Sequence, residues 1–212
     1  LAGPVSDLTW RAGLIAGALG FIIMNGRNDA ANSIGKIIST RVLSPRYAEA
    51  WDELGLVLQH QGKRDESHKA FEQARAADPL FVRPYFGLVG LAADLQDWQE
   101  MERISAAANK LTADPLMFFY NAIANFNLHR FDAAEQSLIR TSQLDSQHRL
   151  PQIDLLFGDV LIQRRDFNGA ADKVREYLAF SSDGTQADAA RAELRQLESL
   201  SSTSKQVAEG PK

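Results

Sequence analysis

From Ala48 onward, apolar residues recur every three or four positions, in runs that come as pairs separated by short polar turns. This spacing places the apolar side chains of each run on one face of a helix. In the first pair, Leu54 and Leu58 precede a Gln-Gly-Lys-Arg turn at 61–64, and Phe71 follows it. The pattern predicts an all-α fold built from helix-turn-helix units.

The paired pattern repeats along the chain. When the turns are aligned, one column contains Arg64, Trp98, Phe131 and Phe167, at separations of 34, 33 and 36 residues. Four units are therefore expected within 46–184, at about 48–81, 82–114, 115–150 and 151–184. Because proline cannot extend a helix, Asp78-Pro79 and Asp114-Pro115 are expected to end the second helices of the first two units.

The first unit carries the spacing W-x2-L-G-x2-hydrophobe, followed by further small and apolar residues at fixed offsets. These residues are Trp51, Leu54, Gly55, Leu58, Phe71, Ala74 and Pro79. The pattern resembles the tetratricopeptide repeat (TPR), with Leu58 and Ser67 as departures. The resemblance covers about residues 46–198. It implies a solenoid whose inner groove, lined by the first helices, binds a protein or peptide, without catalysis or a cofactor.

The end of the chain shows a single helical pattern after the fourth unit. Ala187, Ala190, Leu194 and Leu197 lie at helical spacing, with charged residues on the other faces. A helix at 185–200 is therefore predicted to cap the open end of the repeats. The remaining polar segment, 201–212, is predicted to be disordered.

Three polar residues of the first helices are candidates for partner binding in the groove: Asn121, Asn125 and Gln59. Asn121 and Asn125 lie one helical turn apart, so both amides could contact a peptide backbone. The alternative is that these side chains make surface or inter-helix hydrogen bonds.

The first 45 residues have a different character. Thirteen residues from Ala12 to Met24 carry no charge, and as a helix they would rise about 20 Å, less than a bilayer requires. A short or broken membrane segment, a signal-type segment and a buried helix all remain open. Residues 8–24 are expected to associate with a membrane and leave the repeats in the aqueous phase. If they are not inserted, the protein is expected to be cytoplasmic.

Residues 20–48 contain the pattern N-G-x-N-D-x-A-N, followed by Ser39-Thr40-Arg41 and Ser44-Pro45. This stretch resembles the first signature of the PiT inorganic phosphate transporter family. The resemblance implies that Asp29 binds a coupling cation, while Asn28 and Asn32 contact phosphate or the cation. The plainer alternative is a turn followed by a helix cap. Since that family carries two copies of the motif and only one is found, a fragment or fusion is expected.

Composition removes several classes of function. The chain has 212 residues, 45% hydrophobic and 24% charged, and no cysteine, so it is globular and cannot build a thiolate metal site. Its net charge is −4, with +3 in residues 1–47 and −7 in the rest, which argues against nucleic-acid binding. The four histidines, His60, His68, His129 and His148, lack the spacing of metal ligands. No metal site is predicted.

Overall fold

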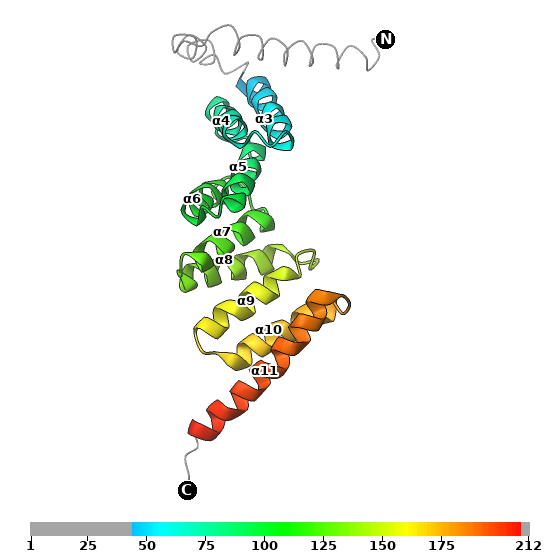
Figure 1. Ribbon diagram of the computed structural model, residues 1–212. Helices are drawn as coiled ribbons and strands as arrows, with labels where there is room; N and C mark the ends of the chain where they lie inside the picture. Colours follow the sequence, from blue (N-terminus) through cyan, green and yellow to red (C-terminus); the bar gives the residue numbers. More distant parts are fainter. Residues whose placement is uncertain (1–43, 209–212) are drawn as a thin grey trace. The chain divides into compact units, whose positions relative to one another are not determined.

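The computed structural model describes residues 44–208, and every regular element in that range is an α-helix (Figure 1). The predicted all-α fold is confirmed. The helices are α3 (Ser44–His60), α4 (Arg64–Ala77), α5 (Arg83–Asp94), α6 (Trp98–Ala108), α7 (Pro115–Asn127), α8 (Phe131–Leu144), α9 (Gln152–Gln163), α10 (Phe167–Phe180) and α11 (Thr185–Ala208).

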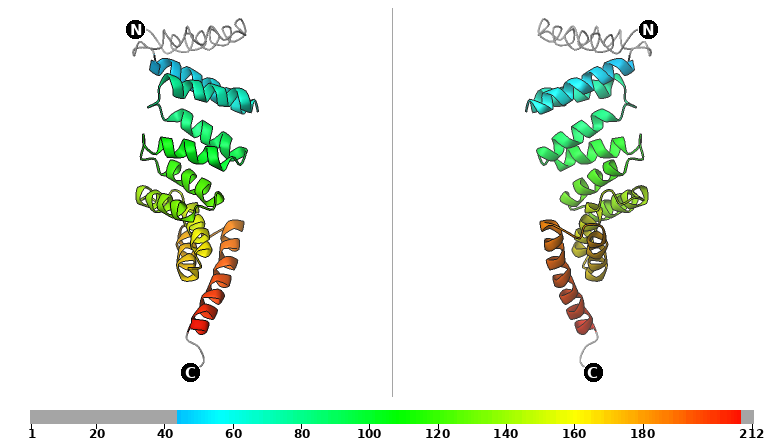
Figure 2. Two further views of the ribbon diagram at one scale, coloured as in Figure 1. Left: turned by 90° about the vertical axis from the view of Figure 1, so that its left-hand side faces the viewer. Right: turned by 90° about the vertical axis from the view of Figure 1, so that its right-hand side faces the viewer.

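The chain divides into two compact units, with the boundary between Leu95 and Gln96. The first unit contains α3, α4 and α5, and the second contains α6 to α11. The boundary falls between the two helices of the second predicted repeat. Within each unit, the two helices of a complete pair lie side by side (Figure 2).

The predicted alignment of the turns is confirmed at every repeat. Each residue of the aligned column is the first residue of a second helix, α4, α6, α8 or α10: Arg64, Trp98, Phe131 and Phe167. Two positions before each of these, the backbone has a positive φ, and the residues are Gly62, Gln96, His129 and Arg165. Only glycine adopts this conformation without steric cost.

Hydrogen bonds account for this conformation at the turns that follow α3, α7 and α9. Where α7 ends, the Arg130 backbone N–H donates to the Asn125 carbonyl at 2.8 Å, and the His129 N–H donates to Phe126 at 2.9 Å. The same two bonds close the ends of α3 and α9. This is the Schellman motif, which pairs carbonyls left free at a helix end. These bonds offset the strain of a positive φ at non-glycine residues.

The two predicted proline stops differ in outcome. The first is confirmed, because α4 ends at Ala77 and Asp78 is its C-terminal cap. The second is wrong: α6 already ends at Ala108, and Pro115 instead begins α7. The Asp114 carboxylate accepts a hydrogen bond from the Leu116 N–H at 2.8 Å. Asp-Pro at this place is therefore a helix start, where the missing proline N–H costs nothing.

The core of the first unit is centred on Phe71, which is fully buried. A β-carbon on Gly55 of α3 or on Gly87 of α5 would lie 2.6 or 2.4 Å from its ring atoms. The ring thus packs directly against two glycines, and a larger residue at either position would collide with it. Ser67, the departure from the repeat pattern, is also buried, and its hydroxyl donates to the Gly55 carbonyl at 2.8 Å.

Apolar clusters join neighbouring helices of the second unit. One joins α7, α8 and α9 through Ala122, Ala134, Leu138, Ile153 and Val160. Another joins α10 and α11 through Ala170, Ala171, Val174, Tyr177, Ala190 and Leu197. The last helix, α11, therefore packs against α10 through Ala190 and Leu197, two of the apolar residues that the sequence places on one face.

The predicted disordered segment from Ser201 onward needs correction, because α11 continues to Ala208. Between Thr185 and Gly210 the sequence contains no glycine or proline. The hydroxyl of Ser202 donates to the Ser199 carbonyl at 2.8 Å within the helix. A polar composition alone does not end a helix; a residue that breaks the backbone pattern does.

Candidate functional site

The predicted site residues fall in three separate places. Asn28, Asp29 and Asn32, assigned to phosphate and cation by resemblance, lie outside the described residues, as does the apolar segment 8–24. Gln59 is partly exposed on α3, next to Gly90 of α5. Asn121 and Asn125 are on α7, in the other unit. In the range 44–208, no helix is long and apolar enough to cross a membrane.

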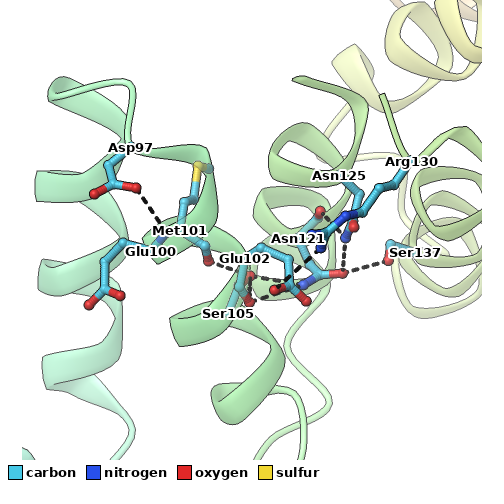
Figure 3. A network of polar contacts seen from close by, with 9 residues as sticks. All are labelled: Asp97, Glu100, Met101, Glu102, Ser105, Asn121, Asn125, Arg130 and Ser137. Carbon is cyan, nitrogen blue, oxygen red and sulfur yellow. Dashed lines mark hydrogen bonds and ion pairs between the residues drawn. The ribbon is translucent and has the colours of Figure 1, made fainter. Parts of the chain in front are cut away.

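Asn121 and Asn125 are buried, with 8% and 4% of their surface exposed, and they form the centre of a polar network (Figure 3). The Asn121 amide nitrogen donates to the Ser105 hydroxyl at 3.0 Å and to the Glu102 carbonyl at 3.4 Å. Its amide oxygen accepts from the Ser137 hydroxyl at 2.8 Å and from the Asn125 amide at 3.0 Å. One side chain thereby connects α6, α7 and α8.

The network leaves these two amide groups with no free hydrogen for a peptide. The Asn125 nitrogen donates both to the Asn121 side chain and to the Asn121 backbone carbonyl, the latter at 2.9 Å. At its edge, Arg130 forms an ion pair with Glu102 at 3.9 Å. Asn121 makes inter-helix hydrogen bonds to α6 and α8, whereas Asn125 bonds to Asn121 within α7. The two asparagines therefore hold α7 in place within the fold and do not offer their amide groups to a partner.

The alignment of the turns indicates that Asn121 and Asn125 lie at buried positions. The separation of 67 residues that relates Arg64 to Phe131 also relates Leu54 to Asn121 and Leu58 to Asn125. Leu54 and Leu58 are buried core residues of the first unit. The two asparagines therefore occupy core positions of the third repeat, although their polar character suggested a surface.

The other side of α7 has the opposite chemistry, and sequence reasoning did not single it out. Leu116, Tyr120 and Ile123 follow one another at spacings of four and three residues along a different face of the helix from Asn121 and Asn125, and all three are partly exposed. Phe119 and Phe126, by contrast, pack against the cluster of α7, α8 and α9. Helix α7 is thus polar at part of its buried face and apolar along a partly exposed stripe, the reverse of an ordinary surface helix.

Two carboxylates on α9 and α11 add charge to the second unit. Burial raises the pKa of Asp159 above its usual value, and it is the only cause. Burial also raises the pKa of Glu193, and the nearby charge of Asp159 raises it further. Among the described residues, no cation forms an ion pair with either group. A cationic ligand would stabilise both carboxylates in their ionised form.

Asp154, also on α9, shows the contrasting arrangement. It is buried, and burial raises its pKa, but the Lys173 ammonium lies 3.6 Å from its carboxylate and opposes the shift. Glu176 shares the same lysine. The charge of Asp154 is therefore compensated within the protein, whereas that of Asp159 is not.

Comparison with known proteins finds similarity for two stretches of the sequence. Residues 48–81 match the tetratricopeptide repeat family. A stretch of 39 residues is 64% identical to a probable low-affinity inorganic phosphate transporter of Rhizobium meliloti (strain 1021). That match covers 18% of this chain and only 12% of the transporter. The resemblance of part of the chain to a phosphate transporter is thus confirmed.

Two solved structures share the fold at low sequence identity. The MamA protein has a TM-score of 0.66 at 15% identity, over 73% of this chain and 84% of that chain. YrrB, described as a TPR protein with an unusual peptide-binding site, has a TM-score of 0.53 at 13% identity, over 79% of this chain and 97% of that chain. The chain therefore contains a tetratricopeptide repeat at residues 48–81, and its described helices have the paired arrangement of the tetratricopeptide-repeat fold.

Proposed function

We propose that the protein is a non-catalytic interaction scaffold that binds a peptide segment of a partner protein. The peptide binds in the second unit, on α7 and α9, which are the first helices of their repeats. The observation that carries this proposal is the reversed chemistry of α7. The amides of Asn121 and Asn125 are hydrogen-bonded inside the fold, while Leu116, Tyr120 and Ile123 remain partly exposed. An apolar stripe that the fold leaves partly in water gains free energy when a partner covers it.

The rigidity of this stripe supports the proposal. Asn121 donates a hydrogen bond to Ser105 of α6 and accepts one from Ser137 of α8, so the stripe belongs to a helix that is held on two sides (Figure 3). A surface ordered before binding loses less conformational entropy when the peptide arrives. The peptide-binding site named for YrrB gives a precedent for such a role in a protein of this fold.

The test is selection of peptides from a displayed library of random 12-residue sequences by the full chain, followed by affinity measurement. We expect the paired substitution Leu116→Ser with Ile123→Ser to reduce the affinity of selected peptides by about tenfold or more, because two apolar contacts are lost. Leu80→Ser is the matched control, since Leu80 is 74% exposed in the first unit. Equal affinities for the parent chain and the paired variant would reject the proposed surface.

A second candidate function, cation-coupled phosphate transport, is favoured by the 39-residue transporter match. In that case Asp29 would bind the cation, and Asn28 and Asn32 would contact phosphate or the cation. Uptake of phosphate into vesicles carrying the full chain, lost in Asp29→Ala and kept in Asp7→Ala, would support this function. Absence of uptake by the parent chain would reject it.

A further inference from the structure

The apolar stripe of α7 continues onto α9, where its chemistry changes. The separation of 36 residues between Phe131 and Phe167 relates Tyr120 to Leu156 and Ile123 to Asp159. Equivalent positions of successive repeats face the same side of a stacked array. Both helices also pack around one cluster, to which α7 contributes Ala122 and α9 contributes Ile153 and Val160. The stripe therefore passes from apolar side chains on α7 to a carboxylate on α9.

Two carboxylates of the second unit, Asp159 and Glu193, form no ion pair with a cation among the described residues. Asp159 is partly buried without a cation, and Glu193 of α11 is close enough for the two negative charges to raise the pKa of Glu193. Several cations of α10 and α11 have other partners: Lys173 pairs with Asp154 and Glu176, Arg175 with Asp172 and Glu198, and Arg191 with Asp188. Asp159 and Glu193 thus lack the counter-charge that other acidic residues on α9 and α11, Asp154 and Asp188, have.

Building on the proposed function, we infer that the bound peptide is basic and apolar, with a lysine or arginine placed against Asp159 and Glu193 and apolar side chains on Leu116, Tyr120, Ile123 and Leu156. Charge complementarity selects this occupant. Partly desolvated carboxylates favour a cation and penalise an acidic segment. The net charge of −7 over the region that holds the repeats also favours the approach of a basic segment.

The experiment uses the full chain and three immobilised libraries of 12-residue peptides. All three have Leu, Ile, Phe or Ala at six positions, and the other six hold Lys or Arg, Asp or Glu, or Ser or Asn. We expect the basic library to be retained about tenfold better than the neutral library, the scale of one hydrogen bond to a charged group. The acidic library should be retained least. Raising the salt concentration should reduce the basic preference.

The deciding variant is Asp159→Asn with Glu193→Gln, which keeps the shape of both side chains. It should bring retention of the basic library to within about twofold of the neutral library and leave neutral retention unchanged. The control, Asp132→Asn with Asp183→Asn, removes the same charge from exposed positions of the second unit and should preserve the preference.

The possible failures are distinguishable. Retention of no library would reject the proposed function itself, together with this inference. A preference for neutral or acidic peptides, or a basic preference that survives Asp159→Asn with Glu193→Gln, would reject only the inference about the partner. If a second copy of the chain covers this face, the protein will be a dimer that Leu116→Ser with Ile123→Ser dissociates, and the inference is wrong.

Discussion

The two units pack the second helix of one repeat against the first helix of the next with opposite chemistry. In the first, Phe71 of α4 lies against Gly87 of α5, and the aromatic ring fills the space that the glycine leaves. In the second, the repeat alignment places Ser105 where the first has Phe71, and this small side chain accepts a hydrogen bond from Asn121 of α7. The helix-pair fold thus requires the contact to be filled and, if polar, fully hydrogen-bonded.

The two solutions differ in what they specify. An apolar contact is non-directional and is stabilised by the area removed from water. A buried hydrogen-bond network is satisfied in one geometry only, and it fixes the alignment of the helices it joins. The second solution suits a helix that must hold a partly exposed apolar stripe in place.

The largest effect is expected at Phe71. Phe71→Ala should lower the free energy of unfolding by about 3–5 kcal/mol, because it removes a fully buried ring and leaves a cavity between two glycines. Hydrogen exchange measured by mass spectrometry should show faster exchange in α3, α4 and α5. A cost below about 1 kcal/mol would mean that the ring is not the centre of this unit.

The next effect tests the glycine beside that ring. Gly87→Ala should cost about 1–3 kcal/mol, because the added β-carbon would lie 2.4 Å from a ring atom of Phe71 and the packing must yield. Gly90→Ala is the matched control on the same helix, where a β-carbon would meet only the Gln59 amide nitrogen at 3.8 Å. It should stabilise the protein by up to about 1 kcal/mol through helix propensity.

A double variant sharpens this test. Phe71→Leu combined with Gly87→Ala should be less destabilised than the sum of the two single variants, since the shorter side chain leaves room for the methyl group. Thermal melts followed by circular dichroism measure all four proteins. Strict additivity would contradict the proposed collision.

The fold could be predicted from sequence because its signals are local and repeated. The turn column gave the first residue of every second helix, from Arg64 to Phe167. The site was harder to predict, because polarity and position gave conflicting indications at Asn121 and Asn125. A polar residue suggests exposure, but the alignment with Leu54 and Leu58 indicated burial. The partners that make this burial possible, Ser105 and Ser137, lie on other helices and are not visible in any local pattern.

Two further features depended on three-dimensional proximity. The closeness of Asp159 to Glu193 depends on the packing of the last helix, which spacing alone does not define. The continuation of α11 beyond Ser201 depends on the absence of a helix-breaking residue rather than on composition. The sequence therefore predicted helices and repeats better than contacts between polar side chains.

The polar counterpart of the Phe71 prediction concerns Asn121. Asn121→Ala should cost about 1–2 kcal/mol, because it removes hydrogen bonds that Ser105, Ser137 and Asn125 make to its side chain. The cost is limited since each of these groups keeps a bond to a backbone carbonyl. Urea denaturation measures the change, and hydrogen exchange should increase in α6, α7 and α8.

Replacing the whole pair separates polarity from packing. Asn121→Leu with Asn125→Leu gives α7 the residues found at Leu54 and Leu58, and it should be less destabilising than Asn121→Ala. A larger loss in the leucine pair than in the alanine variant would show that the hydrogen bonds, rather than filled space, stabilise this contact.

The smallest effect is expected from neutralising Asp159 and Glu193, which should change how the free energy of unfolding depends on pH. Because burial raises the pKa of Asp159 and Glu193 in the folded protein, their ionisation opposes folding. Their contribution is most favourable below the unfolded pKa values of about 4 and is lost as the pH rises through the folded pKa values. Asp159→Asn with Glu193→Gln should therefore leave stability unchanged near pH 3 and increase it at pH 7. The gain should stay below about 1 kcal/mol, because both groups are partly exposed and water screens them.

Urea denaturation at both pH values measures this gain in stability, with Asp132→Asn and Asp183→Asn as the control pair. A loss of stability at pH 7 would show that a cation within the protein already compensates the two carboxylates.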